Sequence, residues 1–167
     1  MDEALAIRLL GRFEVGVGDR RVGDTAWRLR KARTLVKLLA LDPERRVHQD
    51  RLAEMWWPDG DGAVRNNLHQ VLHAARRALG TVGVDHGVVL RHELVQLAPG
   101  RPVLVDVQDF LRRARAARTS TDLRLLESVL AAGQGELLPE DRHEDWARPH
   151  RDALRERRIE LALAAAS

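Results

Sequence analysis

The fold is decided by the stretch Asp61-Gly-Ala-Val-Arg-Asn-Asn-Leu-His-Gln-Val-Leu-His-Ala-Ala-Arg-Arg-Ala-Leu-Gly80. At about 100° per residue, its apolar residues gather on one side of a helix and its polar residues on the other. The apolar side holds Val64, Leu68, Val71, Leu72, Ala75, Ala78 and Leu79. The polar side holds Arg65, Asn66, His69, Gln70, His73, Arg76 and Arg77. This spacing predicts one long amphipathic helix, with Asp61 as its N-cap.

The polar side of this helix carries the side chains that bind nucleic acid. Arg pairs with guanine acceptors, Asn and Gln pair with adenine edges, and these residues also contact phosphate. An ordinary solvated helix face mixes acidic and basic residues in i,i+4 pairs, whereas this one has no acidic residue after Asp61. The pattern therefore favours DNA recognition over a merely solvated face.

Composition places the chain among compact proteins of one or two small domains. The 167 residues are 44% hydrophobic, and the net charge is +3. The first 100 residues carry 16 Lys or Arg and 13 Asp or Glu, and the rest carry 12 of each, so a basic surface is expected in the first half. The chain has no cysteine, which excludes disulfide frameworks and thiolate metal sites. No signal peptide or membrane span is apparent, and we expect a cytoplasmic protein without membrane contact.

The first 100 residues alternate between strand and helix patterns. Period-two alternation over 7–17 and a turn at Gly18-Asp19 predict a small antiparallel sheet. Helical spacing then predicts helices over 28–41 and 49–57, followed by the long helix. Residues 88–97 read as a β-hairpin that turns at His92-Glu93. This order predicts an α+β winged helix, in which the long helix enters the major groove and the hairpin forms the wing.

Beyond the Pro- and Gly-rich segment 99–102 the pattern is entirely helical. Asp106 is the expected N-cap of one helix, a second begins near Asp122, and a third runs from about Pro149 to the end. We therefore divide the chain into a winged-helix domain over 1–100 and an incomplete all-α domain over 101–167. The last helix has an apolar side that nothing later in the sequence covers, so we expect further C-terminal domains of a longer protein or a partner there.

Several motifs together carry a family resemblance across nearly the whole chain. They are Trp27-Arg-Leu-Arg-Lys-Ala-Arg33, Leu38-Leu-Ala-Leu41, Trp57-Pro-Asp59, Asn66-Asn-Leu-His-Gln70 with Arg76-Arg-Ala-Leu79, Val105-Asp-Val107 and Gly135-Glu-Leu-Leu-Pro-Glu-Asp141. With these motifs the chain resembles the Streptomyces antibiotic regulatory protein (SARP) family. Members of that family join an OmpR-type winged helix to a bacterial transcriptional activator domain of tetratricopeptide-like helices.

The resemblance implies a transcription activator of secondary metabolism that binds direct repeats in double-stranded DNA and contacts RNA polymerase. It implies a head-to-tail dimer on DNA. The implied DNA-binding residues are Arg65, Asn66, Asn67, His69, Gln70, His73, Arg76 and Arg77 on the long helix, Arg28, Arg30, Lys31 and Arg33 before and within the first helix, and Arg91 and His92 in the wing. Asn67 projects nearer the apolar side, so a structural hydrogen bond is an equal alternative for it. The implied polymerase contacts are Trp57, Asp59 and Asp61.

Other functions have weaker support in the sequence. His69 and His73 lie four residues apart as metal ligands often do, but that helix face offers no third ligand, so we expect no metal site. No Walker motif or paired carboxylates are present, and we expect neither a cofactor nor enzymatic activity. The four tryptophans are read as core or interface residues rather than base-stacking platforms. The alternative function is a helical protein-interaction or signal-receiving module whose winged helix is a docking surface.

Overall fold

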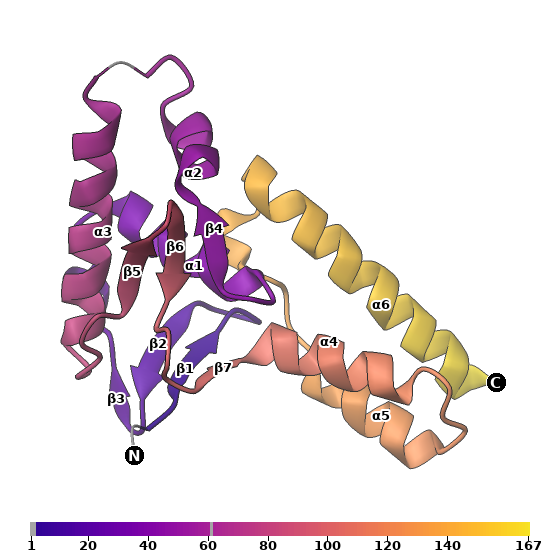
Figure 1. Ribbon diagram of the computed structural model, residues 1–167. Coiled ribbons are helices and arrows are strands. Elements are labelled where there is room, and N and C mark those ends of the chain that lie inside the picture. The colour runs from indigo at the N-terminus through magenta and orange to yellow at the C-terminus, as the bar shows by residue number, and fades with distance from the viewer. Residues whose placement is uncertain (1–2, 61) are drawn as a thin grey trace. The chain divides into compact units, whose positions relative to one another are not determined.

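The computed structural model describes residues 3–60 and 62–167 and has an α+β fold (Figure 1). The strands in the described residues are β1 (Leu5–Arg8), β2 (Glu14–Val17), β3 (Arg20–Arg21), β4 (Arg46–His48), β5 (Val88–Arg91), β6 (Leu94–Leu97) and β7 (Val103–Val105). The helices are α1 (Arg30–Leu41), α2 (Gln49–Trp56), α3 (Val64–Gly80), α4 (Asp106–Ala117), α5 (Leu123–Ala132) and α6 (Arg148–Ala166), with short 3-10 turns η1 (Asp24–Ala26), η2 (Pro139–Asp141) and η3 (Asp145–Ala147). Every long helix and the hairpin predicted from periodicity is present.

The chain forms two compact units, each described here by itself. The first unit comprises the residues up to Ala6 together with Val15–Val103. The second comprises Ile7–Glu14 and Leu104–Ser167. The short segment 7–14 thus groups with helices that follow it by about 100 residues in the chain, a grouping that sequence order does not reveal.

In the first unit, α1 and α3 supply much of the apolar core. Leu35 and Leu39 of α1 are fully buried, as are Leu72 and Leu79 of α3. Helix α1 begins two residues later than its pattern predicts. It ends at Leu41, and its C-cap Asp42 is extended because the following Pro43 disfavours helical backbone in the preceding residue. Burial of such leucines contributes about 2 kcal/mol each relative to exposure, so these helices are held mainly by their inward faces.

The predicted wing is the hairpin of β5 and β6, and this hairpin belongs to a three-stranded sheet of order β4-β6-β5. Its register pairs Val88 with Leu97 and Arg91 with Leu94, both antiparallel. The two residues of the turn, His92 and Glu93, have φ values of 53° and 67°. Two left-handed residues in succession match the twist of a tight hairpin, so the turn lies where the sequence predicts it.

The second, four-stranded sheet has the order β3-β2-β1-β7. Gly18 has a φ of 60° in the turn between β2 and β3, where Val17 pairs with Arg20. Strand β7 is absent from the sequence-based prediction because only three residues separate Pro102 from α4, too few for an alternating pattern. The expected alternation over 7–17 is interrupted, since β1 ends at Arg8 and β2 begins at Glu14.

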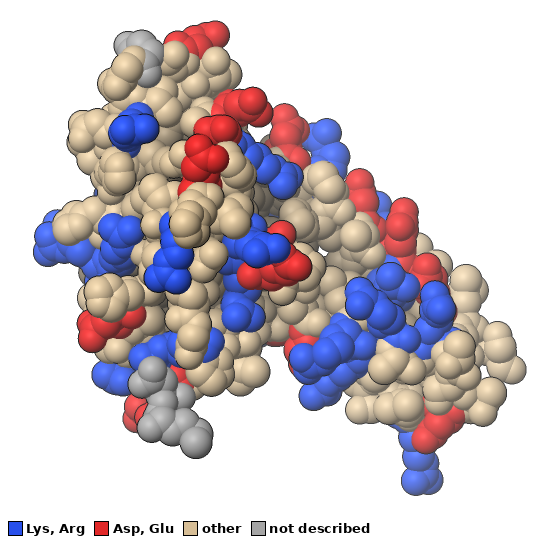
Figure 2. Space-filling view, viewed as in Figure 1, with Lys and Arg blue, Asp and Glu red and all other residues tan. Residues whose placement is uncertain are grey.

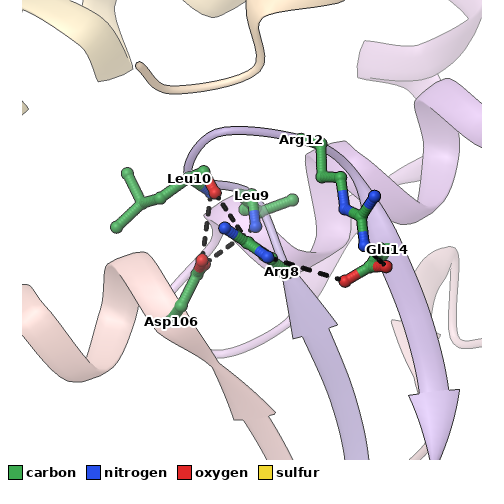
Figure 3. Close-up of polar contacts among 6 residues, drawn as sticks. All are labelled: Arg8, Leu9, Leu10, Arg12, Glu14 and Asp106. Carbon is green, nitrogen blue, oxygen red and sulfur yellow. Dashed lines mark hydrogen bonds and ion pairs between the residues drawn. The ribbon is translucent and has the colours of Figure 1, made fainter. Parts of the chain in front are cut away.

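In the second unit, the carboxylate of Asp106 holds the segment that follows β1 (Figure 3). Its Oδ1 accepts the backbone N–H of Leu9 over 2.8 Å, and its Oδ2 accepts that of Leu10 over 3.0 Å. The N-cap residue of α4 is Val105, and Asp106 is the first helical residue. Asp106 is therefore not the N-cap that the sequence predicts but the residue after it, and its carboxylate binds a distant segment as well as the N–H of Val107.

The Gly135–Asp141 motif has a packing role in the same unit. The N–H of Gly11 donates to the carbonyl oxygen of Glu136 over 2.8 Å, and the N–H of Leu138 donates to that of Leu9 over 2.9 Å. Leu138 has a φ of 45°, a left-handed conformation that costs energy for a branched side chain and that these contacts stabilise. From α6, Arg151 donates to the carbonyl oxygens of Leu137 and Leu138.

Candidate nucleic-acid interface

Helix α3 presents the polar face that its sequence predicts. The exposed positions on it are Arg65, Asn66, His69, Gln70, His73 and Arg77, and the half-buried positions are Val64, Asn67 and Arg76. All of the other residues predicted to lie inward are buried. An amphipathic helix of this length holds its outer side chains on one rigid support, as base reading requires. The half-buried state of Asn67 agrees with its projection near the apolar side.

Arg76 differs from its neighbours on α3. Its Nε donates to the carbonyl oxygen of Val88 at the start of the wing over 2.6 Å. In Figure 1, α3 runs alongside β5, the strand that contains Val88. This contact gives Arg76 a positioning role between α3 and the β5–β6 hairpin. Its role as a DNA contact stays a prediction.

A groove of ≈ 400 Å³ lies between α2, the N-terminal half of α3 and the wing. Arg65 and His69 line it from α3, Asp50 lines it from α2, and Glu93 lines it from the wing turn. Carboxylates are therefore absent from α3 itself but present beside its N-terminal half. Carboxylates repel phosphate. Asn66 and His73 do not line this groove, so their surroundings are more favourable for a nucleic acid.

His48 joins the wing turn to the start of α2. Its Nδ1 accepts the N–H of Asp50 over 3.1 Å as the N-cap of α2, and its Nε2 lies 3.5 Å from Oε2 of Glu93. The N–H of Gln49 also donates to the carbonyl oxygen of Glu93 over 2.8 Å. His48 is not among the functional residues that the sequence predicts. The available signal was a polar side chain directly before a helix that has Asp50 in its first turn.

The Arg28–Arg33 segment has mixed surroundings. Arg28 and Arg30 are exposed, and Arg28 lies just before α1. The Nζ of Lys31 lies 5.8 Å from the ring centroid of Trp57, within the range of a cation–π contact. Arg33 lies 3.5 Å from Asp24. Arg28 is exposed and forms no side-chain hydrogen bond or ion pair in the described residues that would compete with phosphate.

In the wing, Arg91 and His92 are both exposed. Arg91 is the last residue of β5, and His92 is the first residue of the turn. Side chains at the tip of a hairpin are the ones that reach the DNA backbone or the minor groove when the neighbouring helix occupies the major groove. The positions of both are therefore compatible with the predicted contact.

The segment after α2 carries the predicted polymerase contacts. Asp59 is exposed, and Trp57 is half-buried with its ring 5.7 Å from that of Trp56 in an edge-on arrangement. Asp61, predicted as a polymerase contact, lies outside the described residues, and the N-cap of α3 is Ala63 rather than the predicted Asp61. All four tryptophans are half-buried rather than stacked in the open. Such surroundings are typical of packing residues.

Two negative findings apply to the described residues. No group of three or more His, Cys, Asp or Glu in 3–60 and 62–167 is arranged to hold a metal ion. Among the helices that the structure describes, none combines the length and the apolar composition needed to cross a membrane.

Comparison with known proteins gives a likeness in fold. No protein-family model matches the chain, and no curated protein sequence matches it. The fold is similar to that of Mycobacterium tuberculosis EmbR, whose structure was solved in complex with a low affinity phosphopeptide, with a TM-score of 0.77 and 20% sequence identity. The similarity covers 99% of this chain and 45% of the EmbR chain, so this chain spans less than half of that protein. The chain therefore has an EmbR-like α+β fold.

Proposed function

We propose that this protein is a sequence-specific DNA-binding transcription regulator. The observation that carries this proposal is the outer face of α3, where Asn66, His73 and Arg77 are exposed on a helix that has no carboxylate. Amide, imidazole and guanidinium groups offer the donors and acceptors that read base edges in the major groove. The arrangement of a long helix beside a hairpin is the one by which winged helices bind DNA.

In this proposal the two parts of the chain have different tasks. Residues 1–100 bind DNA, with α3 in the major groove, the wing near the backbone and Arg28 on phosphate. Residues 101–167 form a helical activator part. The SARP resemblance supports an activator that contacts RNA polymerase through the segment around Asp59. It also supports two copies arranged head to tail on direct repeats.

The decisive experiment is selection of bound sequences from random DNA, followed by footprinting of the selected sequence. We expect enrichment of a direct repeat whose half-sites lie about one helical turn, 10–10.5 bp, apart, so that both copies of α3 meet one face of the duplex. Inserting about 5 bp between the half-sites should abolish cooperative binding, and inserting a full turn should partly restore it. Recovery of no preferred sequence would contradict the proposal.

One observation favours a second candidate, a protein-interaction module. The second unit exposes large apolar side chains, among them Ile159 at 52% and Leu163 at 64% on α6 and Leu123 at 50% at the start of α5. Exposed apolar residues are common singly, whereas a contiguous group of them marks an interface. Binding to DNA distinguishes the candidates: a regulator loses affinity steeply with salt because phosphate contacts release counterions, whereas a docking module has no such dependence.

A further inference from the structure

The turn of the β5–β6 hairpin is held by the residues at the end of β4. His48, the last residue of β4, pairs with Leu94 in the antiparallel register, and the N–H of Gln49 donates to the carbonyl oxygen of Glu93 over 2.8 Å. Pairing along β4 therefore extends to the end of the turn. Because the turn consists of His92 and Glu93 alone, only these two residues project beyond the anchor.

The side chain of His48 adds a second link to the turn. Its Nδ1 accepts the N–H of Asp50 over 3.1 Å, which requires the ring proton of a neutral imidazole to lie on Nε2. That Nε2 lies 3.5 Å from Oε2 of Glu93, so one ring contacts the first turn of α2 and the hairpin turn at once. No other histidine of the first unit forms a side-chain hydrogen bond or ion pair in the described residues, namely His69, His73, His86 and His92.

The contact also decides which group binds the carboxylate of Glu93. Figure 2 shows acidic side chains, in red, over α2, the helix that His48 caps. Glu93 adjoins His92 and lies two residues from Arg91, and a carboxylate without a partner beside these predicted DNA contacts would repel phosphate. In the structure Glu93 pairs with His48, and Arg91 forms no ion pair in the described residues. The charge of Arg91 is therefore available to an external anion.

We propose that His48 is a positioning residue for DNA binding, which fixes the hairpin turn through Glu93 and thereby sets the places of Arg91 and His92. Side chains that are already ordered lose less conformational entropy when DNA is bound, so holding the turn raises the affinity. All four residues belong to the first unit, so the inference depends on that unit alone. It rests on the proposed function, in which the hairpin meets DNA.

The test uses His48→Asn in the full chain. Asparagine is among the best N-cap residues, so it retains the cap of α2, but its shorter side chain does not reach Glu93. Binding to the duplex selected from random DNA should weaken by about two- to tenfold, the cost of ordering one side chain on binding. The thermal unfolding midpoint should stay near the wild-type value. His86→Asn is the matched control and should change neither, because His86 is exposed and forms no side-chain hydrogen bond or ion pair in the described residues.

Two further backgrounds identify the route of the effect. His48→Asn should weaken binding no further once Glu93→Ala has removed its partner. It should also add nothing to Arg91→Gln/His92→Asn, which lacks both predicted contacts of the hairpin and in which asparagine tolerates the left-handed turn. A residue that supported only the fold would weaken binding equally in every background, because the effects of independent sites add. An undiminished effect in either background overturns the proposal, as does wild-type binding by His48→Asn.

Amide hydrogen exchange of residues 91–94 in the DNA-free chain separates this inference from the proposed function. Exchange there should be faster in His48→Asn than in the wild type and unchanged in His86→Asn, because the turn opens more often when the His48 contact is lost. Unchanged exchange in His48→Asn overturns the proposal even if the chain selects a DNA sequence. Faster exchange in a chain that selects no sequence overturns the proposed function and the DNA-binding role, while the link from His48 to the turn stands.

Discussion

The Nε of Arg76 donates to the carbonyl oxygen of Val88 over 2.6 Å, and this bond joins the C-terminal half of α3 to the first strand of the wing. Val88 is fully buried. The angle between α3 and the β5–β6 hairpin therefore depends in part on a side chain that the sequence pattern assigns to DNA alone. Because only Arg76 makes this contact, substitutions of Arg76 and of its neighbour Arg77 can separate an effect on stability from an effect on DNA binding.

Replacing Arg76 with alanine should lower the free energy of unfolding by about 1–3 kcal/mol, because the carbonyl group of Val88 loses its partner. Urea unfolding measures this change. Arg77→Ala is the matched control: the Arg77 side chain is exposed and makes no hydrogen bond or ion pair in the described residues. Its loss should alter stability by less than about 0.5 kcal/mol. Equal stability of the two variants would contradict a structural role for Arg76.

His73 should read a base, because it lies near the middle of the exposed face of α3. His73→Ala should weaken binding to the selected operator by about 1–3 kcal/mol and relax the preference at one base pair. Binding titrations with operators substituted one base pair at a time measure both effects. Uniform weakening on every sequence would instead make His73 a backbone contact.

Arg28 should bind phosphate. Arg28→Gln should reduce the salt slope of DNA binding by about one unit and leave base preference unchanged. A suitable control is Arg46→Gln, since Arg46 already pairs with Glu44. If the slope stays at the wild-type value for Arg28→Gln, the segment before α1 does not touch the backbone.

Asp59 should serve activation rather than DNA binding. It is exposed in the loop after α2 and does not belong to the face of α3. Asp59→Asn should therefore reduce transcription from a promoter that carries the operator while the footprint stays intact. Loss of the footprint together with transcription would place this loop in the DNA contact or in the fold.

The ion pair of Glu136 and Arg142 should make stability depend on acid pH. The hydrogen bond from the Arg142 guanidinium lowers the pKa of Glu136 below its ordinary value of 4.5, although partial desolvation opposes the shift. Because the folded-state pKa is depressed, the stabilisation is complete above about pH 4.5 and is lost as the pH falls through the lowered pKa.

Thermal unfolding between about pH 3 and pH 6 measures this dependence. Glu136→Gln should lose stability less steeply on acidification than the wild type does. The exposed Glu127, which makes no ion pair in the described residues, provides the control variant Glu127→Gln. A wild-type acid profile in Glu136→Gln would show that the pair does not contribute.

The amino-acid sequence by itself determined the long helix α3 and the hairpin of β5 and β6. Periodicity located α3, with Leu68, Leu72 and Leu79 facing inward, and two turn residues located the wing at His92-Glu93. These features are local, because neighbouring side chains three or four residues apart decide a helix face and two residues decide a tight turn. The polar composition of α3 was also readable in advance, and its assignment to DNA stays a prediction.

The tertiary structure alone decided which polar groups are available and which segments meet. Helical projection places Arg76 beside Arg65, yet only packing ties Arg76 to Val88 and sets Arg65 in a groove with Asp50 and Glu93. The bond from Leu9 to Asp106 spans 97 residues. Such contacts depend on how separate elements pack, because side-chain partners distant in sequence leave no period or spacing in the chain.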